Sequence, residues 1–118
     1  MPDYMLLLHE RPELFANVTP DDMERVIAKY VEWRTKLGAA GKLTGGNKLR
    51  DDAGRIIEAR SPGGRVEVRD GPFTETKDVI GGYFIVNAAD YDEAIAISRD
   101  CPHLAFGGRI ELREIEIP

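Results

Sequence analysis

Apolar and polar residues follow one another along the chain with spacings that predict both strands and helices. Residues 4–8 form a short, continuous apolar run, which is typical of a central strand buried on both faces. Thr19 followed by Pro20 predicts a helix that continues to about Leu37, because threonine caps helices and proline is favoured at their first position. The apolar residues of this helix recur mostly three or four positions apart and predict one buried face: Met23, Val26, Ile27, Tyr30, Val31, Trp33 and Leu37.

The middle of the chain is rich in glycine and polar residues, and it contains three short segments with strand-like composition. These are residues 42–49, 55–60 and 65–69, which are separated by the turn sequences Asp-Asp-Ala-Gly and Ser-Pro-Gly-Gly. Residues 65–69 alternate strictly between charged residues and valine, so Val66 and Val68 share one face of their strand. We therefore expect exposed hairpins in this part of the chain.

Two further strands are predicted in the second half of the chain. Residues 79–87 have the most strand-like composition, and the pair Gly81 and Gly82 near their start is typical of a β-bulge or of a close backbone approach by a ligand or another chain; a bulge is the simpler interpretation. Residues 109–117 form the last strand. Its apolar positions change phase along its length, which predicts a bulge or a change of packing surface.

A second helix is predicted between these two strands. Asp90 with Glu93 three residues later forms a variant of the capping box, which predicts a helix that runs to about Asp100 and is ended by Pro102. Small and apolar residues give this helix a packing face: Ala94, Ile95, Ile97 and Ser98.

The order of these elements predicts the fold class. Two β-α-β halves with right-handed crossovers on one antiparallel sheet make an α+β, ferredoxin-like domain, here with an inserted hairpin and two helices on one face. The other face of such a sheet is bare. A second copy of the chain is the simplest cover for its apolar residues, so we expect a homodimer.

Composition restricts the function classes. The 118 residues, 42% of them apolar, fit one domain spanning residues 1–118. The net charge of −5 and the lack of basic runs interleaved with aromatic residues argue against direct nucleic-acid binding. The apolar run near the N-terminus is far shorter than the roughly 20 residues of a membrane span. Cys101 is the single cysteine, which agrees with a reducing compartment, so we expect a cytoplasmic protein without membrane contact.

The sequence predicts neither a cofactor nor a metal. Residues 38–46 contain glycines but lack the spacing of Walker or dinucleotide-binding loops. Cys101 and His103 offer two ligands with a proline between them, whereas structural zinc needs four. A lone cysteine at a helix end more often packs than acts as a nucleophile.

Residues 70–78 are the most unusual segment. They place a tight turn directly after a strand and follow it with closely spaced functional side chains. Asp, Gly and Pro are all turn residues, so the segment could be a solvated connection. Alternatively, a rigid turn fixes Asp70 and Phe73 while the side chains at 74–77, including Glu75 and Lys77, project into a pocket.

Several motifs resemble those of one protein family. They are YMLLL at residues 4–8, DGPFTETKD at 70–78, GGYFIV at 81–86, ADYDEAI at 89–95, CPHL at 101–104 and IELREI at 110–115. Together they resemble the DGPF family of YCII-related proteins over nearly the whole chain. The family signature more usually ends in Lys-Glu, whereas this chain has Lys77 followed by Asp78, whose carboxylate reaches less far.

The resemblance implies a dimeric ferredoxin-like, or α+β barrel, fold in a largely uncharacterised family. Members are often associated with sigma factors of the extracytoplasmic-function type. Related YCII proteins are suspected of using a His-Asp pair in a cleft.

Two histidines are candidates for such a pair. His103 follows Pro102 and could share a cleft with Asp70, which would fix the imidazole tautomer and leave one ring nitrogen as an acid or base. A histidine in this place could instead cap carbonyls at the helix end. His9, after the first strand, is the other candidate.

Three hypotheses of function follow. In the first, Asp70 and His103 work in a small-molecule site in which Lys77 or an arginine holds an anion and Phe73 with Trp33 forms an apolar wall. In the second, the dimer is a regulatory module that presents its polar loop to a partner such as a sigma factor. The third is a plain dimeric scaffold.

Overall fold

A four-stranded antiparallel sheet forms the body of the protein in the computed structural model, which describes residues 1–11, 13, 17–50, 54–71 and 78–118. The strands of this sheet, in spatial order, are β2 (Leu43–Lys48), β5 (Val79–Asn87), β1 (Asp3–Glu10) and β6 (Arg109–Glu114). Three helices accompany it: α1 (Pro20–Ala39), α2 (Tyr91–Arg99) and α3 (Pro102–Ala105). A separate two-stranded ribbon consists of β3 (Gly54–Ala59) and β4 (Val66–Gly71).

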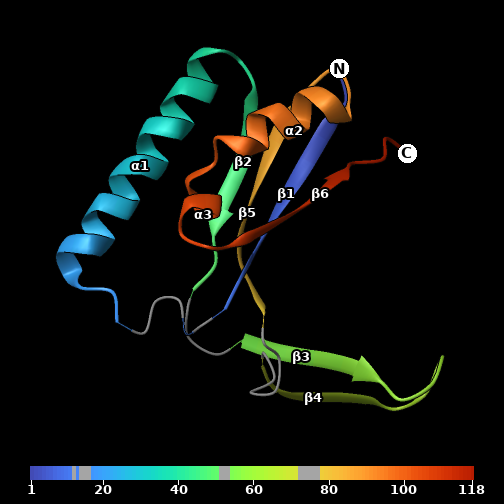
Figure 1. Ribbon diagram of the computed structural model, residues 1–118. Helices are drawn as coiled ribbons and strands as arrows, with labels where there is room; N and C mark the ends of the chain where they lie inside the picture. The colour runs from blue at the N-terminus through green and yellow to red at the C-terminus, as the bar shows by residue number, and fades with distance from the viewer. Residues whose placement is uncertain (12, 14–16, 51–53, 72–77) are drawn as a thin grey trace.

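The strand order confirms the predicted ferredoxin-like fold. The last strand, β6, lies beside the first, β1, and the ribbon is inserted between β2 and β5 (Figure 1). The hydrophobic core lies between the sheet and the helices, and it joins residues of β1 and β5 to residues of the helices and the segments next to them: Tyr4, Leu6, Leu8, Trp33, Leu37, Phe84, Val86, Ala88, Ala94 and Cys101. The helices therefore cover one face only.

Helix α1 begins as its sequence predicts. The Thr19 hydroxyl accepts a hydrogen bond from the Asp22 amide at 3.1 Å, and Pro20 occupies the first turn. The predicted buried face is only partly correct, since Trp33 and Leu37 are buried but other predicted members, Ile27 and Val31, are exposed. The N-terminal half of α1 diverges from the strands (Figure 1), so only its C-terminal half packs on the sheet.

Helix α2 also begins at its predicted cap, where the Asp90 carboxylate accepts from the Glu93 amide at 2.9 Å. Ala94 and Ser98 form its buried face. Pro102, predicted to end this helix, instead begins the short helix α3, because the fixed φ angle of proline suits a first helical turn.

The pair Gly81 and Gly82 produces the predicted bulge. The register between β1 and β5 shifts after Leu8, which pairs with Gly82, while His9 pairs with Ile80, and Gly81 is left without a partner residue. The last strand ends at Glu114 and so is shorter than predicted. The phase change after Leu112 marks its end rather than a bulge.

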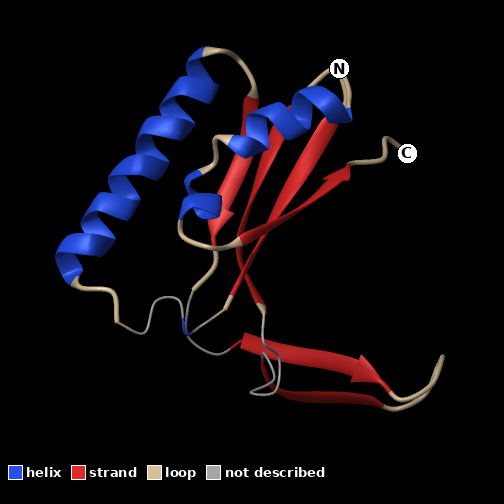
Figure 2. Cartoon of the chain, in the orientation of Figure 1, coloured by secondary structure: helices blue, strands red, loops and turns tan. Residues whose placement is uncertain are grey.

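The molecule is thin and extended. Its radius of gyration is 16.3 Å, whereas a compact domain of this length has about 13.5 Å. Its dimensions are 47 × 43 × 18 Å, because one helix layer lies on one sheet and the ribbon projects from an end of that sheet (Figure 2). Among the described residues, no helix is long and apolar enough to span a membrane.

Candidate functional site

Buried and half-buried side chains alternate along the central strands β1 and β5, and this alternation distinguishes the two faces of the sheet. Tyr4, Leu6 and Leu8 point toward the helices, so the residues between them point the other way. We call that uncovered surface the open face. Its outward residues on β1 and β5 are Met5, Leu7, His9, Ile80, Tyr83 and Ile85.

His9 lies on the open face at the C-terminal end of β1, where it forms an acid–base pair. Its Nε2 is 2.8 Å from Oε1 of Glu111 on the neighbouring strand β6. A carboxylate only accepts hydrogen bonds, so Nε2 donates and Nδ1 is the basic nitrogen of the neutral ring. No described residue bonds to that Nδ1. The Glu111 carboxylate also lies 3.9 Å from Nη1 of Arg113.

Asp78, the last residue of the motif at residues 70–78, is held near His9 by two ion pairs. Its carboxylate pairs with Arg109 at 2.9 Å and with Arg11 at 3.7 Å. Arg109 is the residue of β6 that pairs with His9 in register. The segment that carries the family signature therefore returns to the body at the His9 end of the sheet.

His103 lies on the other face, within the core, and is 2% exposed. Its Nε2 is 2.7 Å from the backbone oxygen of His9, which accepts, so its Nδ1 accepts from the Tyr30 hydroxyl at 3.3 Å. Burial raises the pKa of Tyr30, which keeps this hydroxyl protonated as a donor. Gly108 lies directly against the imidazole, because a Cβ there would collide with it. His103 thus joins α3, α1 and β1.

Asp70 lies in strand β4 of the ribbon. Its side chain is 86% exposed and pairs with Nη1 of Arg55 across the two strands at 3.5 Å. Among the described residues, no hydrogen bond connects Asp70 with His103 or His9, and a functional role for Asp70 stays a prediction. The other signature candidates, Phe73, Glu75 and Lys77, lie outside the described residues.

Trp33 is buried in the core, where its ring meets the edge of Phe84 with the centroids 4.9 Å apart. Its indole Nε1 has no hydrogen-bond partner among the described residues. The sheet separates Trp33 and His103 on the helix side from the His9 ring on the open face. Trp33 and the His9 ring, the two predicted ligand-binding residues in the described part of the chain, therefore lie on opposite faces of the sheet.

Cys101 is buried, and burial raises the pKa of its thiol to about 11. A thiol that stays protonated at neutral pH is a poor nucleophile, which agrees with a packing role. Within the described ranges, no group of three or more His, Cys, Asp or Glu residues could hold a metal ion.

Glu111 was not among the site residues predicted from the sequence, although the order of the strands contains a signal for it. A ferredoxin-like order places the last strand beside the first, so a residue of β6 must neighbour His9. The alternation of Ile110, Glu111 and Leu112 then puts the carboxylate on the same face as the His9 ring.

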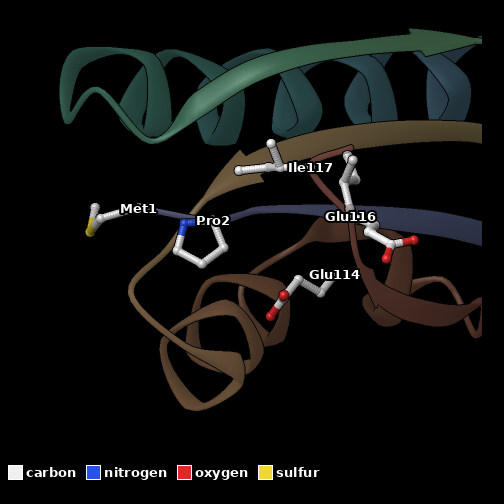
Figure 3. A pocket seen from close by; sticks show the side chains of 6 residues that line it. Met1, Pro2, Glu114, Glu116 and Ile117 are labelled. Carbon is white, nitrogen blue, oxygen red and sulfur yellow. The ribbon is translucent and has the colours of Figure 1, made fainter.

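An open pocket of about 710 Å³ lies beside Met1 and Pro2, just before the start of β1, whereas His9 is near the other end of that strand. Figure 3 shows the side chains that line this pocket. None of the predicted site residues lines it. It is formed by the two ends of the described chain, with both acidic and apolar side chains: Met1, Pro2, Glu114, Ile115, Glu116 and Ile117.

Comparison with known proteins identifies the family. Residues 3–116 match the YCII-related domain. An uncharacterized protein of Rhizobium meliloti (strain 1021) is 38% identical over 82 residues, which cover 67% of this chain and 57% of that protein. The fold resembles that of 5-chloro-2-hydroxyhydroquinone dehydrochlorinase (TftG) from Burkholderia phenoliruptrix AC1100, solved in complex with 2,5-dihydroxybenzoquinone. The TM-score is 0.55 at 16% identity, over 100% of this chain and 96% of that chain. The chain belongs to the family of proteins with a YCII-related domain.

Proposed function

We propose that this protein binds a small molecule on the open face of its sheet and performs acid–base chemistry on it with His9. The observation that carries the proposal is the 2.8 Å hydrogen bond between His9 and Glu111. The carboxylate orients the imidazole through Nε2, which leaves Nδ1 directed away from it as the nitrogen that takes and returns a proton.

A homodimer would complete this site. The open face carries half-buried apolar side chains around Leu7 and Tyr83, and none of the helices in the described part of the chain covers it. A second copy placed on this face would exclude water from His9 and Glu111, which strengthens their electrostatic interaction. The dimeric barrel implied by the family resemblance has this arrangement.

The residues around His9 favour a small, flat and largely apolar ligand with an ionisable group. Met5 and Leu7 provide an apolar floor, and the Tyr83 hydroxyl, which accepts from Asn47 at 3.1 Å, adds a polar group at its side. The quinone bound by TftG belongs to this chemical class, so hydroxylated aromatic and quinoid compounds are the first probes. Phe73, Glu75 and Lys77 are proposed to add contacts, because their segment ends at Asp78.

The experiment compares three variants, His9→Gln, His103→Gln and Asp70→Asn, with the parent protein in a thermal-shift and turnover screen of these compounds. We expect a compound that raises the melting temperature of the parent but not that of His9→Gln. If the compound is turned over, its rate should fall by roughly 10²–10⁴-fold in His9→Gln, as for loss of a general base. We expect Asp70→Asn to respond like the parent.

Two outcomes would contradict the proposal. An undiminished response of His9→Gln, combined with a lost response of Asp70→Asn and of a folded His103→Gln, would favour the Asp70–His103 pair instead. No response of the parent to any compound would favour a non-enzymatic module with a protein partner such as a sigma factor. The exposed apolar residues of the ribbon support this second function.

A further inference from the structure

The ribbon formed by β3 and β4 has one face with two ion pairs and a second face that is apolar toward its tip, while the Arg55–Asp70 ion pair lies on this second face at the base of the ribbon. On the first face, which we call the charged face, Arg69 pairs with Glu58, and Arg60 pairs with Glu67 at 2.9 Å. The register places Ile57 opposite Val68 and Ala59 opposite Val66, so these four residues share the other face. We call the surface formed by these four residues the ribbon's apolar face.

The apolar face is exposed over most of its area. Ile57, Val66 and Val68 are 70%, 59% and 62% exposed. Figure 2 shows the ribbon extending away from the sheet and helices. An isolated two-stranded ribbon is marginally stable in water. Its apolar face therefore needs a cover that the described part of one chain does not supply.

Apolar residues of the open face reach the end of the sheet from which the ribbon extends. Ile80 pairs with His9 and therefore lies on the open face, at the end of the sheet from which the ribbon extends. Leu49, just before the ribbon, is exposed to the same extent as Ile80. Whatever covers the open face thus lies next to the base of the ribbon.

The size of the open face shows why a second copy would use the ribbon as well. Four strands about 4.8 Å apart and six residues long present a flat area of roughly 400 Å². A stable dimer buries about 800 Å² on each partner. The two strands of the ribbon enlarge the available surface by about half, and they do so next to the same interface.

We propose that the ribbon of each copy packs its apolar face against the second copy, so that two ribbons clasp the dimer. This inference rests on the proposed homodimer and adds to it. Because a two-fold axis makes the contact reciprocal, both ribbons are buried together. The charged face, with its ion pairs, then faces solvent.

The test compares two double variants by sedimentation equilibrium. Val66→Lys with Val68→Lys places charges on the ribbon's apolar face. The control, Ile27→Lys with Val31→Lys, makes equivalent changes on α1, where the two residues are 55% and 57% exposed. We expect the dimer dissociation constant of the ribbon variant to rise at least tenfold, because each lysine would have to be buried without a partner. The control should dimerise like the parent.

A parent that sediments as a 13.2 kDa monomer at micromolar concentration would overturn both the homodimer and this inference. A dimeric parent and an equally tight ribbon variant would overturn the ribbon contact alone. Hydrogen exchange of the parent provides a measurement without substitutions. Amides of residues 55–59 and 66–70 should exchange faster when the dimer is diluted below its dissociation constant, and exchange independent of dilution would also reject the ribbon contact.

Discussion

The two histidines of this chain are linked through the backbone carbonyl of His9, yet their rings lie in different surroundings. The His9 ring points to the open face and bonds to the half-exposed Glu111, whereas the buried His103 bonds to the carbonyl of His9. A change in the position of β1 at His9 would therefore move both rings. His103 supports the end of the strand that carries the proposed base.

A prediction at the residue scale concerns Cys101 and alkaline pH. The pKa of its thiol is raised by burial from 9.0 to about 11, so the folded protein keeps a proton that the unfolded chain loses. Stability should therefore fall as the pH rises from about 9 toward 11. Urea unfolding of the parent at pH 8 and pH 10.5 measures this fall, and Cys101→Ala should reduce it.

Burial also raises the pKa of Tyr30, so this residue too should lower the stability of the folded protein as the pH rises. Part of the loss of stability should therefore remain in Cys101→Ala. Tyr30→Phe serves as the matched variant. An identical pH dependence in the parent and in both variants would show that neither group is linked to folding.

Sequence patterns within single helices and strands predicted much of the architecture. They did not predict which parts of different elements contact one another. Thr19 and Asp90 mark their helix starts correctly because capping depends on neighbouring atoms. Periodicity shows which residues could face a sheet, yet Ile27 remains exposed because α1 diverges from the strands. Similarly, the pairing of His9 with Glu111 follows from strand order and appears in neither segment alone.

At the element scale, two glycines near helix ends should respond in opposite ways to alanine. A Cβ at Gly108 would collide with the buried His103 ring, whose two hydrogen bonds prevent it from moving away. Gly108→Ala should therefore cost about 1–3 kcal/mol of unfolding free energy. Gly38 lies within α1 and has open space at its Cβ position, so Gly38→Ala should add about 0.5–1 kcal/mol. Chemical denaturation of both variants measures the contrast, and equal effects would contradict it.

The thin shape of the whole molecule explains why its function is expected in a pair of chains. At 18 Å in its smallest dimension, the protein has one buried layer of side chains and one sheet surface without a cover. The proposed base lies on that uncovered surface, where water would otherwise compete for it. A substitution on the open face should therefore weaken both dimer formation and the proposed activity of His9.

The last prediction tests this connection with Ile85→Lys. Ile85 lies on the open face, pairs with Met5 on β1 and is half-buried, so its substitution by lysine leaves the core between sheet and helices intact. Light scattering should give a monomer mass for this variant and twice 13.2 kDa for the parent. Because the His9–Glu111 pair is unchanged but no longer covered, we expect the variant to bind the parent's ligand at least tenfold more weakly. Ile117→Lys, a change at an apolar residue of the C-terminal segment that is 83% exposed, is the control and should keep both properties. A dimeric Ile85→Lys protein with parental affinity would show that neither property depends on the open face.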